Sequence, residues 1–154
     1  MVRSFSIRLT WCVALLGIAA GCDESPTDIA AADPDVQTFV SLMNDHRVSV
    51  GCDPLTWIPE VAAVAQAHSV DMVEREYFDH TNPDGLSPFD RMREAGVSFS
   101  RGAENIAWGY STPESVLQGW LDSSGHRANI ENCSLTEHGV GLYQTRWTHL
   151  FRTP

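Results

Sequence analysis

The chain of 154 residues contains no lysine, so all ten of its basic residues are arginines, and twenty acidic residues outnumber them two to one. At pH 7 the formal net charge is therefore −10. A surface with this charge repels phosphate backbones and anionic lipid headgroups. We therefore expect no nucleic-acid partner, and no contact with a membrane except through an N-terminal lipid.

The sequence also lacks the short motifs of several enzyme classes. It contains no Gly-x-Ser-x-Gly nucleophile elbow, no His-Glu-x-x-His zinc helix, no phosphate-binding glycine loop and no Cys-x-x-Cys pair. Ser87 and Ser124 lie near histidines in the sequence, but nothing around them indicates an activated nucleophile. Any catalysis would have to use other side chains.

Long apolar runs are missing too, with one short exception near the N-terminus. Leu9–Ala20 is apolar but too short to cross a membrane comfortably, and Arg3 and Arg8 lie at its start, a pattern typical of a signal peptide. The small residues Ala19-Ala20-Gly21 then lead into Cys22. This ending predicts a bacterial lipoprotein that is cleaved and lipidated at Cys22. Ordinary secretion, with cleavage near the same small residues, is the alternative.

The chain then divides into three parts. Residues 1–21 form the predicted signal peptide, residues 22–33 an acidic tether that begins at the lipidated Cys22, and residues 34–154 a single folded domain. Once the signal peptide is removed, eight arginines face twenty acidic residues, a formal charge of −12. We expect an exported monomer, held in the cell envelope as a lipoprotein or, alternatively, secreted.

Two cysteines, Cys52 and Cys133, remain in the predicted domain. Two cysteines in an exported domain most often pair, so we predict a disulfide, with two free buried thiols as the alternative. The bridge would close a loop of about 80 residues and contribute roughly 3–4 kcal/mol by the chain-entropy model. Its Cα atoms should lie about 5–6 Å apart.

Hydrophobic periodicity and capping signals predict both helices and strands. Helices are expected over residues 35–48, 58–76, 87–95 and 112–123. Strands are expected over residues 102–109, 139–143 and 146–152, the last two as a hairpin. Helices on either side of a small antiparallel sheet predict an α+β fold, a three-layer α-β-α sandwich. Four tryptophans are expected to pack in its core: Trp57, Trp108, Trp120 and Trp147.

Three short stretches set a titratable side chain among glycines, small residues and aromatics. They contain His80, Glu104 and His126, which follow one another at intervals of 24 and 22 positions. Two imidazoles and a carboxylate are the groups that bind a divalent metal or move protons near neutral pH. Two histidines and one glutamate also match the ligand count of a catalytic zinc site.

In this order and spacing the motifs resemble those of the CAP superfamily (cysteine-rich secretory proteins, antigen 5 and pathogenesis-related-1 proteins), in particular its compact bacterial members. His126 precedes Gly139-Val-Gly141 by 13 residues, as the matching histidine precedes the Gly-x-Gly strand of that family. The resemblance runs from about Asp35 to Pro154. It implies the same three-layer sandwich and a solvent-accessible cavity around His80, Glu104 and His126.

The family cavity usually holds a second glutamate, on the helix before the second histidine. Here Ser123 occupies the matched position, with Asp122 beside it, so both residues are assigned to the cavity although the fourth member itself is absent or replaced. Divalent ions in the family bind mainly at the two histidines. The resemblance therefore implies a metal ion, with zinc as the first choice, at His80, His126 and Glu104.

Three functions are compatible with these expectations. The first, which we prefer because catalytic motifs are missing, is an exported, lipid-anchored binding module for a small hydrophobic ligand, a cell-envelope component or a protein partner. The second is a metal-dependent hydrolase or protease, with Glu104 as base toward a metal-bound water. The third is a structural envelope protein in which His80 caps backbone carbonyls and Glu104 accepts hydrogen bonds from backbone amides.

Overall fold

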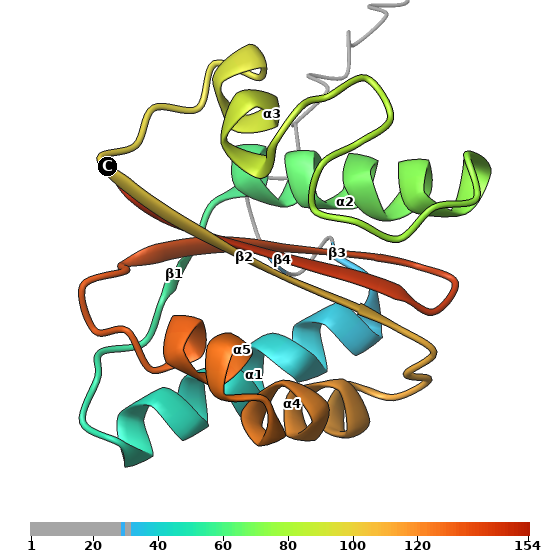
Figure 1. The fold of residues 1–154 in the computed structure, drawn as a ribbon. Coiled ribbons are helices and arrows are strands. Elements are labelled where there is room, and N and C mark those ends of the chain that lie inside the picture. The colour runs from blue at the N-terminus through green and yellow to red at the C-terminus, as the bar shows by residue number, and fades with distance from the viewer. Residues whose placement is uncertain (1–28, 30–31) are drawn as a thin grey trace, which may run out of the picture.

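The computed structural model describes residue 29 and residues 32–154, so the predicted signal peptide, Cys22 and nearly all of the tether lie outside the described residues. Over this range the chain forms an α-β-α sandwich (Figure 1). Helices α2 and α3 cover one face of the sheet, and α1, α4 and α5 cover the other. The three-layer α+β architecture predicted from the sequence is confirmed. Of the helices described, none is long and apolar enough to span a bilayer.

Four of the five helices lie close to their predicted positions. Their bounds are α1 Pro34–Ser49, α2 Pro59–Glu74, α3 Pro88–Glu94, α4 Pro113–Asp122 and α5 Ser124–Ile130. The first four each begin with a proline, whose missing N–H costs nothing in the first turn. Ser87 and Thr112 cap α3 and α4 through reciprocal capping boxes. Helix α5 was not predicted, because it lacks the proline and the capping side chain that mark the equally short α3.

The sheet contains four strands in the order β1-β3-β4-β2. Their bounds are β1 Thr56–Trp57, β2 Arg101–Trp108, β3 Glu137–Tyr143 and β4 Arg146–Thr153. Strands β3 and β4 form the predicted hairpin, and β2 pairs antiparallel with β4. The two-residue β1 runs parallel to β3, so the sheet is mixed rather than antiparallel throughout. A strand this short leaves no periodic pattern in the sequence.

Helix α2 lies directly against β3, because two glycines of the strand face it. A Cβ atom at Gly139 would lie 2.1 Å from the backbone nitrogen of Ala62, and one at Gly141 would lie 2.3 Å from that of Gln66. No side chain fits at these two positions, so the Gly-Val-Gly motif sets the distance between helix and sheet. Gln66 joins the layers further by exchanging two hydrogen bonds with the backbone of Leu142.

Successive side chains of β4 point to opposite faces of the sheet, and each face has its own hydrophobic core. Trp147 and Phe151 belong to the core beneath α1 and α4, where the ring of Phe39 packs against those of Trp147 and Trp120. Leu150 belongs to the core beneath α2 and α3. The sheet is therefore covered on both faces, and each layer of helices has its own apolar contact with it.

Trp108 departs from the expectation that four tryptophans pack in the core. It is the last residue of β2, and 58% of its surface is exposed. The guanidinium of Arg146 lies 3.8 Å from the centre of its ring, and the ring of Phe78 lies 6.1 Å away. Because the residue stands where the chain leaves the sheet, no helix covers it.

A disulfide joins Cys52 to Cys133, whose Cα atoms lie 5.0 Å apart, as predicted. Arg47 reinforces the same junction, since it is 1% exposed and its guanidinium donates four hydrogen bonds to backbone carbonyls. The acceptors are the carbonyls of Asp53, Ile130, Asn132 and Leu135. The disulfide and this arginine together hold the end of α1 against the end of α5, and α5 carries His126.

Candidate functional site

Glu104 lies in β2 at the centre of the candidate site, and its side chain is 1% exposed. Both carboxylate oxygens are engaged. Oε1 accepts a hydrogen bond from Nδ1 of His80 at 2.7 Å, and Oε2 accepts one from Nη2 of Arg91 at 2.5 Å. A buried carboxylate needs partners of this kind, because an unpaired buried charge costs several kcal/mol. The strand therefore presents a fixed anion between an arginine and a histidine.

Arg91 reaches Glu104 from α3, and its side chain is 9% exposed. Its Nη1 also donates to the carbonyls of His80, at 2.7 Å, and Leu86, at 3.2 Å. One guanidinium thus holds both the carboxylate and the loop that carries the histidine. Arg91 was not among the site residues predicted from the sequence. A buried glutamate predicts a cation nearby, but nothing in the spacing of the ten arginines selects this one.

His80 lies in the loop between α2 and α3, and its side chain is 48% exposed. The hydrogen bond to Glu104 raises the pKa of His80, since it favours the imidazolium, while partial burial opposes this shift. A carboxylate partner also makes Nδ1 the protonated nitrogen. Among the described residues, none contacts Nε2 of His80 by hydrogen bond or ion pair. Nε2 is therefore the atom available to a proton or a metal ion.

His126 reaches the same neighbourhood from α5. Partial burial lowers the pKa of His126, and positive charge on His80 lowers it further. The carbonyl of His126 accepts a hydrogen bond from Nδ2 of Asn105 at 3.1 Å, and Oδ1 of Asn105 accepts one from Asn129 at 2.8 Å. Asn105 is fully buried and follows Glu104 in β2, so it attaches α5 to the strand that carries the carboxylate. Asn105 was not among the site residues predicted from the sequence.

Asp122 and Ser123 lie outside this network of contacts. Asp122 ends α4, is exposed, and accepts a hydrogen bond from Nε2 of Gln118 at 2.8 Å. Ser123 is half-buried at the junction of α4 and α5, and its side chain makes no capping hydrogen bond. Over residues 32–154, no hydrogen bond or ion pair joins either residue to His80 or Glu104.

The side chains around Glu104 determine which atoms could bind a metal ion. Within the part of the chain that the structure describes, no group of three or more His, Cys, Asp or Glu side chains is arranged to hold one. Glu104 is occupied by His80 and Arg91, so it serves as an acceptor behind one imidazole. Two imidazoles, one of them oriented by a carboxylate, are a donor set that fits a divalent transition metal such as zinc.

The sequence matches one protein family and two curated bacterial proteins. Residues 40–149 match the family described as "CAP: Cysteine-rich secretory protein family". The chain is 40% identical over 129 residues to the uncharacterized protein YkwD of Bacillus subtilis, covering 82% of this chain and 49% of that protein. It is 38% identical over 113 residues to the uncharacterized membrane protein YlbC of the same organism, covering 73% of this chain and 33% of that protein. The chain therefore spans half or less of the length of these curated relatives.

Solved structures share the fold. An extracellular protein containing an SCP domain, from Bacillus anthracis, aligns with a TM-score of 0.76 at 37% identity, covering 78% of this chain and 40% of that one. An outer surface protein from Borrelia burgdorferi aligns with a TM-score of 0.73 at 22% identity, covering 77% of this chain and 92% of that one. At 22% identity the second likeness concerns the fold alone.

Proposed function

Because the chain belongs to the cysteine-rich secretory protein (CAP) family, we propose that it acts outside the cytoplasm as a CAP-domain binding module. Export by the predicted signal peptide, and anchoring through a lipid on Cys22, are parts of this proposal. The relative from Bacillus anthracis is described as extracellular, which supports export. The paired Cys52 and Cys133 support it as well, because disulfides persist in oxidising compartments.

The proposed binding site is the pair of imidazoles of His80 and His126. The observation that carries it is the 2.7 Å hydrogen bond from Nδ1 of His80 to the buried carboxylate of Glu104. This bond orients the ring and leaves Nε2 for a ligand, as in many zinc sites. A zinc ion held by the two rings would supply a positive charge with open coordination positions for a ligand. That ligand would be a cell-envelope component, a protein partner or a small hydrophobic molecule.

A hydrolase is less well supported by the same geometry. It needs Glu104 as the base that activates a water. Both oxygens of Glu104 already accept hydrogen bonds, one of them from a guanidinium, so a catalytic base here would have to lose a partner first. Asp122, the other acid assigned to the cavity, is exposed and accepts from Gln118.

Zinc calorimetry on the purified protein tests the proposal. We expect zinc binding by the wild type and none by the His80→Ala/His126→Ala double variant. Glu104→Gln should weaken binding about tenfold without abolishing it, because an amide oxygen still accepts from His80 but carries no charge. Affinity should rise with pH, since the proton of His80, whose pKa is raised, must leave before the metal binds.

Asp122→Asn is the matched control, because it neutralises an acid that the structure places outside the network. It should bind zinc as the wild type does. Equal binding by the wild type and the double histidine variant would refute the site and favour the structural alternative.

A further inference from the structure

Three side chains lie side by side across the sheet where β2 ends and β3 turns into β4. Strand pairing places Arg146 of β4 opposite Trp108 of β2 and, on its other side, opposite Tyr143 of β3. Directly paired residues of neighbouring strands project from the same face of a sheet. Figure 1 shows the β3–β4 turn and the end of β2 at the same side of the molecule, and the N–H of Gly109 donates to the carbonyl of Thr145 at 3.0 Å. Arg146 is therefore the middle of a row that has an aromatic residue on each side.

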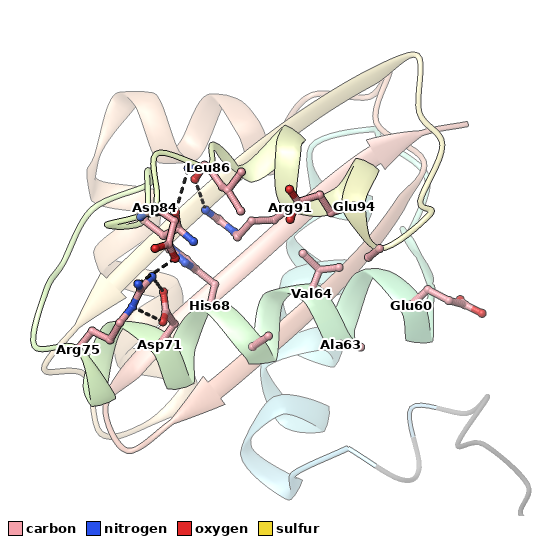
Figure 2. A pocket seen from close by; sticks show the side chains of 13 residues that line it. Glu60, Ala63, Val64, His68, Asp71, Arg75, Asp84, Leu86, Arg91 and Glu94 are labelled. Atoms are coloured by element: carbon pink, nitrogen blue, oxygen red, sulfur yellow. Dashed lines mark hydrogen bonds and ion pairs between the residues drawn. The ribbon is translucent and has the colours of Figure 1, made fainter.

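The aromatic residues of this row are exposed. Trp108 is 58% exposed and Tyr143 38%, and Phe78, whose ring lies 6.1 Å from that of Trp108, is 42% exposed. None of these three lines the groove of about 610 Å³ between α2 and α3 (Figure 2), or the cavity of about 390 Å³ that residues of α1, α2 and β3 line. Together with Arg146 they form an open surface, which we call the aromatic surface. Exposed apolar patches rimmed by polar side chains mark sites of interaction.

Arg146 has no anionic partner among the described residues. Its guanidinium lies 3.8 Å from the centre of the Trp108 ring, and no hydrogen bond or ion pair with a described residue involves it. Of its nitrogens only Nε is buried, so Nη1 and Nη2 are accessible to solvent. Burial lowers the pKa of Arg146, and no carboxylate in the described range opposes this shift. By contrast, Figure 2 shows Arg75 held between Asp71 and Asp84.

The shape and the charge of the aromatic surface favour a sugar ring that carries a carboxylate. A pyranose has an apolar face of C–H groups that can lie flat on an aromatic ring while its hydroxyl groups stay in water, so it needs no pocket. An apolar peptide side chain gains most of its affinity from burial in a pocket. The two terminal nitrogens of a guanidinium match the two oxygens of one carboxylate. A polyanion is disfavoured, because the net charge of the protein is −10.

From this arrangement we infer that the aromatic surface binds a glycan with a carboxylate on a sugar ring. The ring stacks on the exposed part of Trp108, and its carboxylate pairs with Nη1 and Nη2 of Arg146. Tyr143 and Phe78 border the same surface and extend it for neighbouring sugars of the glycan. Phe78 lies two positions before His80, so the surface adjoins the loop that carries this histidine. Neither the proposed metal ion nor the pair of imidazoles takes part in this binding.

The test uses two disaccharides, cellobiouronic acid and cellobiose, which differ only in whether C6 of one sugar carries a carboxylate or a hydroxymethyl group. NMR titration of the full exported protein in the presence of EDTA follows the indole N–H signal of Trp108, which is identified by its loss in Trp108→Phe. We expect cellobiouronic acid to bind about fivefold more tightly than cellobiose. This preference should shrink as salt is added, because Arg146 is only partly buried.

Two kinds of variant separate the charge from the stacking. Arg146→Gln should remove the preference for cellobiouronic acid over cellobiose. Arg101→Gln is the matched control and should change nothing, because Arg101 is an exposed arginine at the other end of β2 that likewise has no hydrogen bond or ion pair with a described residue. Trp108→Ala should weaken both disaccharides about tenfold, because the stacking ring is lost. Val48→Ala removes an exposed apolar side chain of α1 and should leave both affinities unchanged.

The outcomes decide the inference. Equal affinity of the wild type for the two disaccharides, binding of neither, or an equal loss in Arg101→Gln and Arg146→Gln would overturn it. Wild-type affinity in Trp108→Ala would place the sugar elsewhere. The acidic dipeptide N-acetyl-Leu-Glu amide should bind more weakly than cellobiouronic acid, and the reverse order would make the partner a peptide. His80→Ala/His126→Ala should bind cellobiouronic acid as the wild type does, which distinguishes failure of this surface from failure of the metal site.

Discussion

The histidine pair at the surface and the histidine pair in the core differ in what their nitrogens contact. His80 is 48% exposed and donates to the buried carboxylate of Glu104, with His126 nearby. His138 and His149 are fully buried and contact each other, with Nδ1 of His138 3.0 Å from Nε2 of His149. Of the described residues, none offers a partner to the remaining nitrogen of either core ring.

These surroundings shift the pKa values in opposite directions. Glu104 raises the pKa of His80, whereas burial lowers the pKa of His138 to about 3 and the pKa of His149 well below its ordinary value. The core rings therefore stay neutral and pack as aromatic groups, with the ring of His149 3.8 Å from that of Phe151. A carboxylate and access to solvent thus decide whether a histidine can carry a proton near neutral pH, and spacing in the sequence supplies neither.

The largest expected effect concerns the core pair, which should make the domain sensitive to acid. In the unfolded chain both histidines regain pKa values near 6.5, so the unfolded state binds more protons and stability falls as the pH drops from 6.5 toward 3. We expect the unfolding free energy to fall by about 2–4 kcal/mol between pH 7 and pH 5. Urea unfolding across this range measures it.

His149→Gln provides the matched comparison for the core pair. It removes one of the two groups that take up a proton on unfolding, so the slope of stability against pH should fall by about 1.4 kcal/mol per pH unit. This change in slope is independent of any loss of stability at neutral pH. A slope equal to that of the wild type would show that His149 is not the source of the acid sensitivity.

A somewhat smaller effect is expected from removing the carboxylate of the surface pair. Glu104→Ala leaves the nearly buried Arg91 without its anion, and breaking a buried pair in this way costs about 3 kcal/mol. Asp122→Ala removes an exposed acid and should change the unfolding free energy by less than about 0.5 kcal/mol. Similar losses in the two variants, measured by urea unfolding, would contradict the central position of Glu104.

The smallest effects are those on the titration of the surface pair, which NMR of the imidazole protons can follow. His80 should titrate above its ordinary pKa of 6.5 and His126 below it. Glu104→Gln should lower the pKa of His80, and His80→Ala should raise the pKa of His126 because a nearby positive charge is lost. Unchanged titration of His126 in His80→Ala would place the two rings too far apart to share a ligand.

The stability effect of His80 has the opposite sign from that of the core pair. Its raised pKa stabilises the folded state, fully below pH 6.5, and this contribution is lost as the pH rises through the folded pKa. Because the side chain is half exposed, solvent screens the interaction and the contribution is small. The loss of unfolding free energy at acidic pH should therefore come mainly from His138 and His149.

The elements that the sequence predicted are those with local signals. The four predicted helices each begin with a proline, three of them after a capping side chain, and the three longer strands carry β-rich runs between turns. The two elements it missed are β1, which has only two residues, and α5, which has neither a proline nor a capping side chain at its start. The parallel pairing of β1 with β3 also joins residues 81 positions apart, such as Thr56 and Glu137, which no local pattern predicts.

The residues of the candidate site likewise include some that the sequence predicted and some that it did not. The motifs located His80, Glu104 and His126, because a titratable group among glycines is visible in the sequence. They did not identify Arg91 or Asn105 as partners, since those contacts depend on how helices pack against the sheet. The assignment of Asp122 to the cavity rests on a matched position and stays a prediction, and the side chain of Asp122 accepts a hydrogen bond from Gln118.

By itself the sequence determined the layered α+β fold and the three motifs, because their signals are residues close together in the chain. Only the tertiary structure decided which histidine gains a carboxylate and which is sealed in the core. Glu104 is 24 residues from His80, and His149 is 11 residues from His138. Burial and charge pairing depend on neighbours in space, so the properties of these side chains were set when the layers packed.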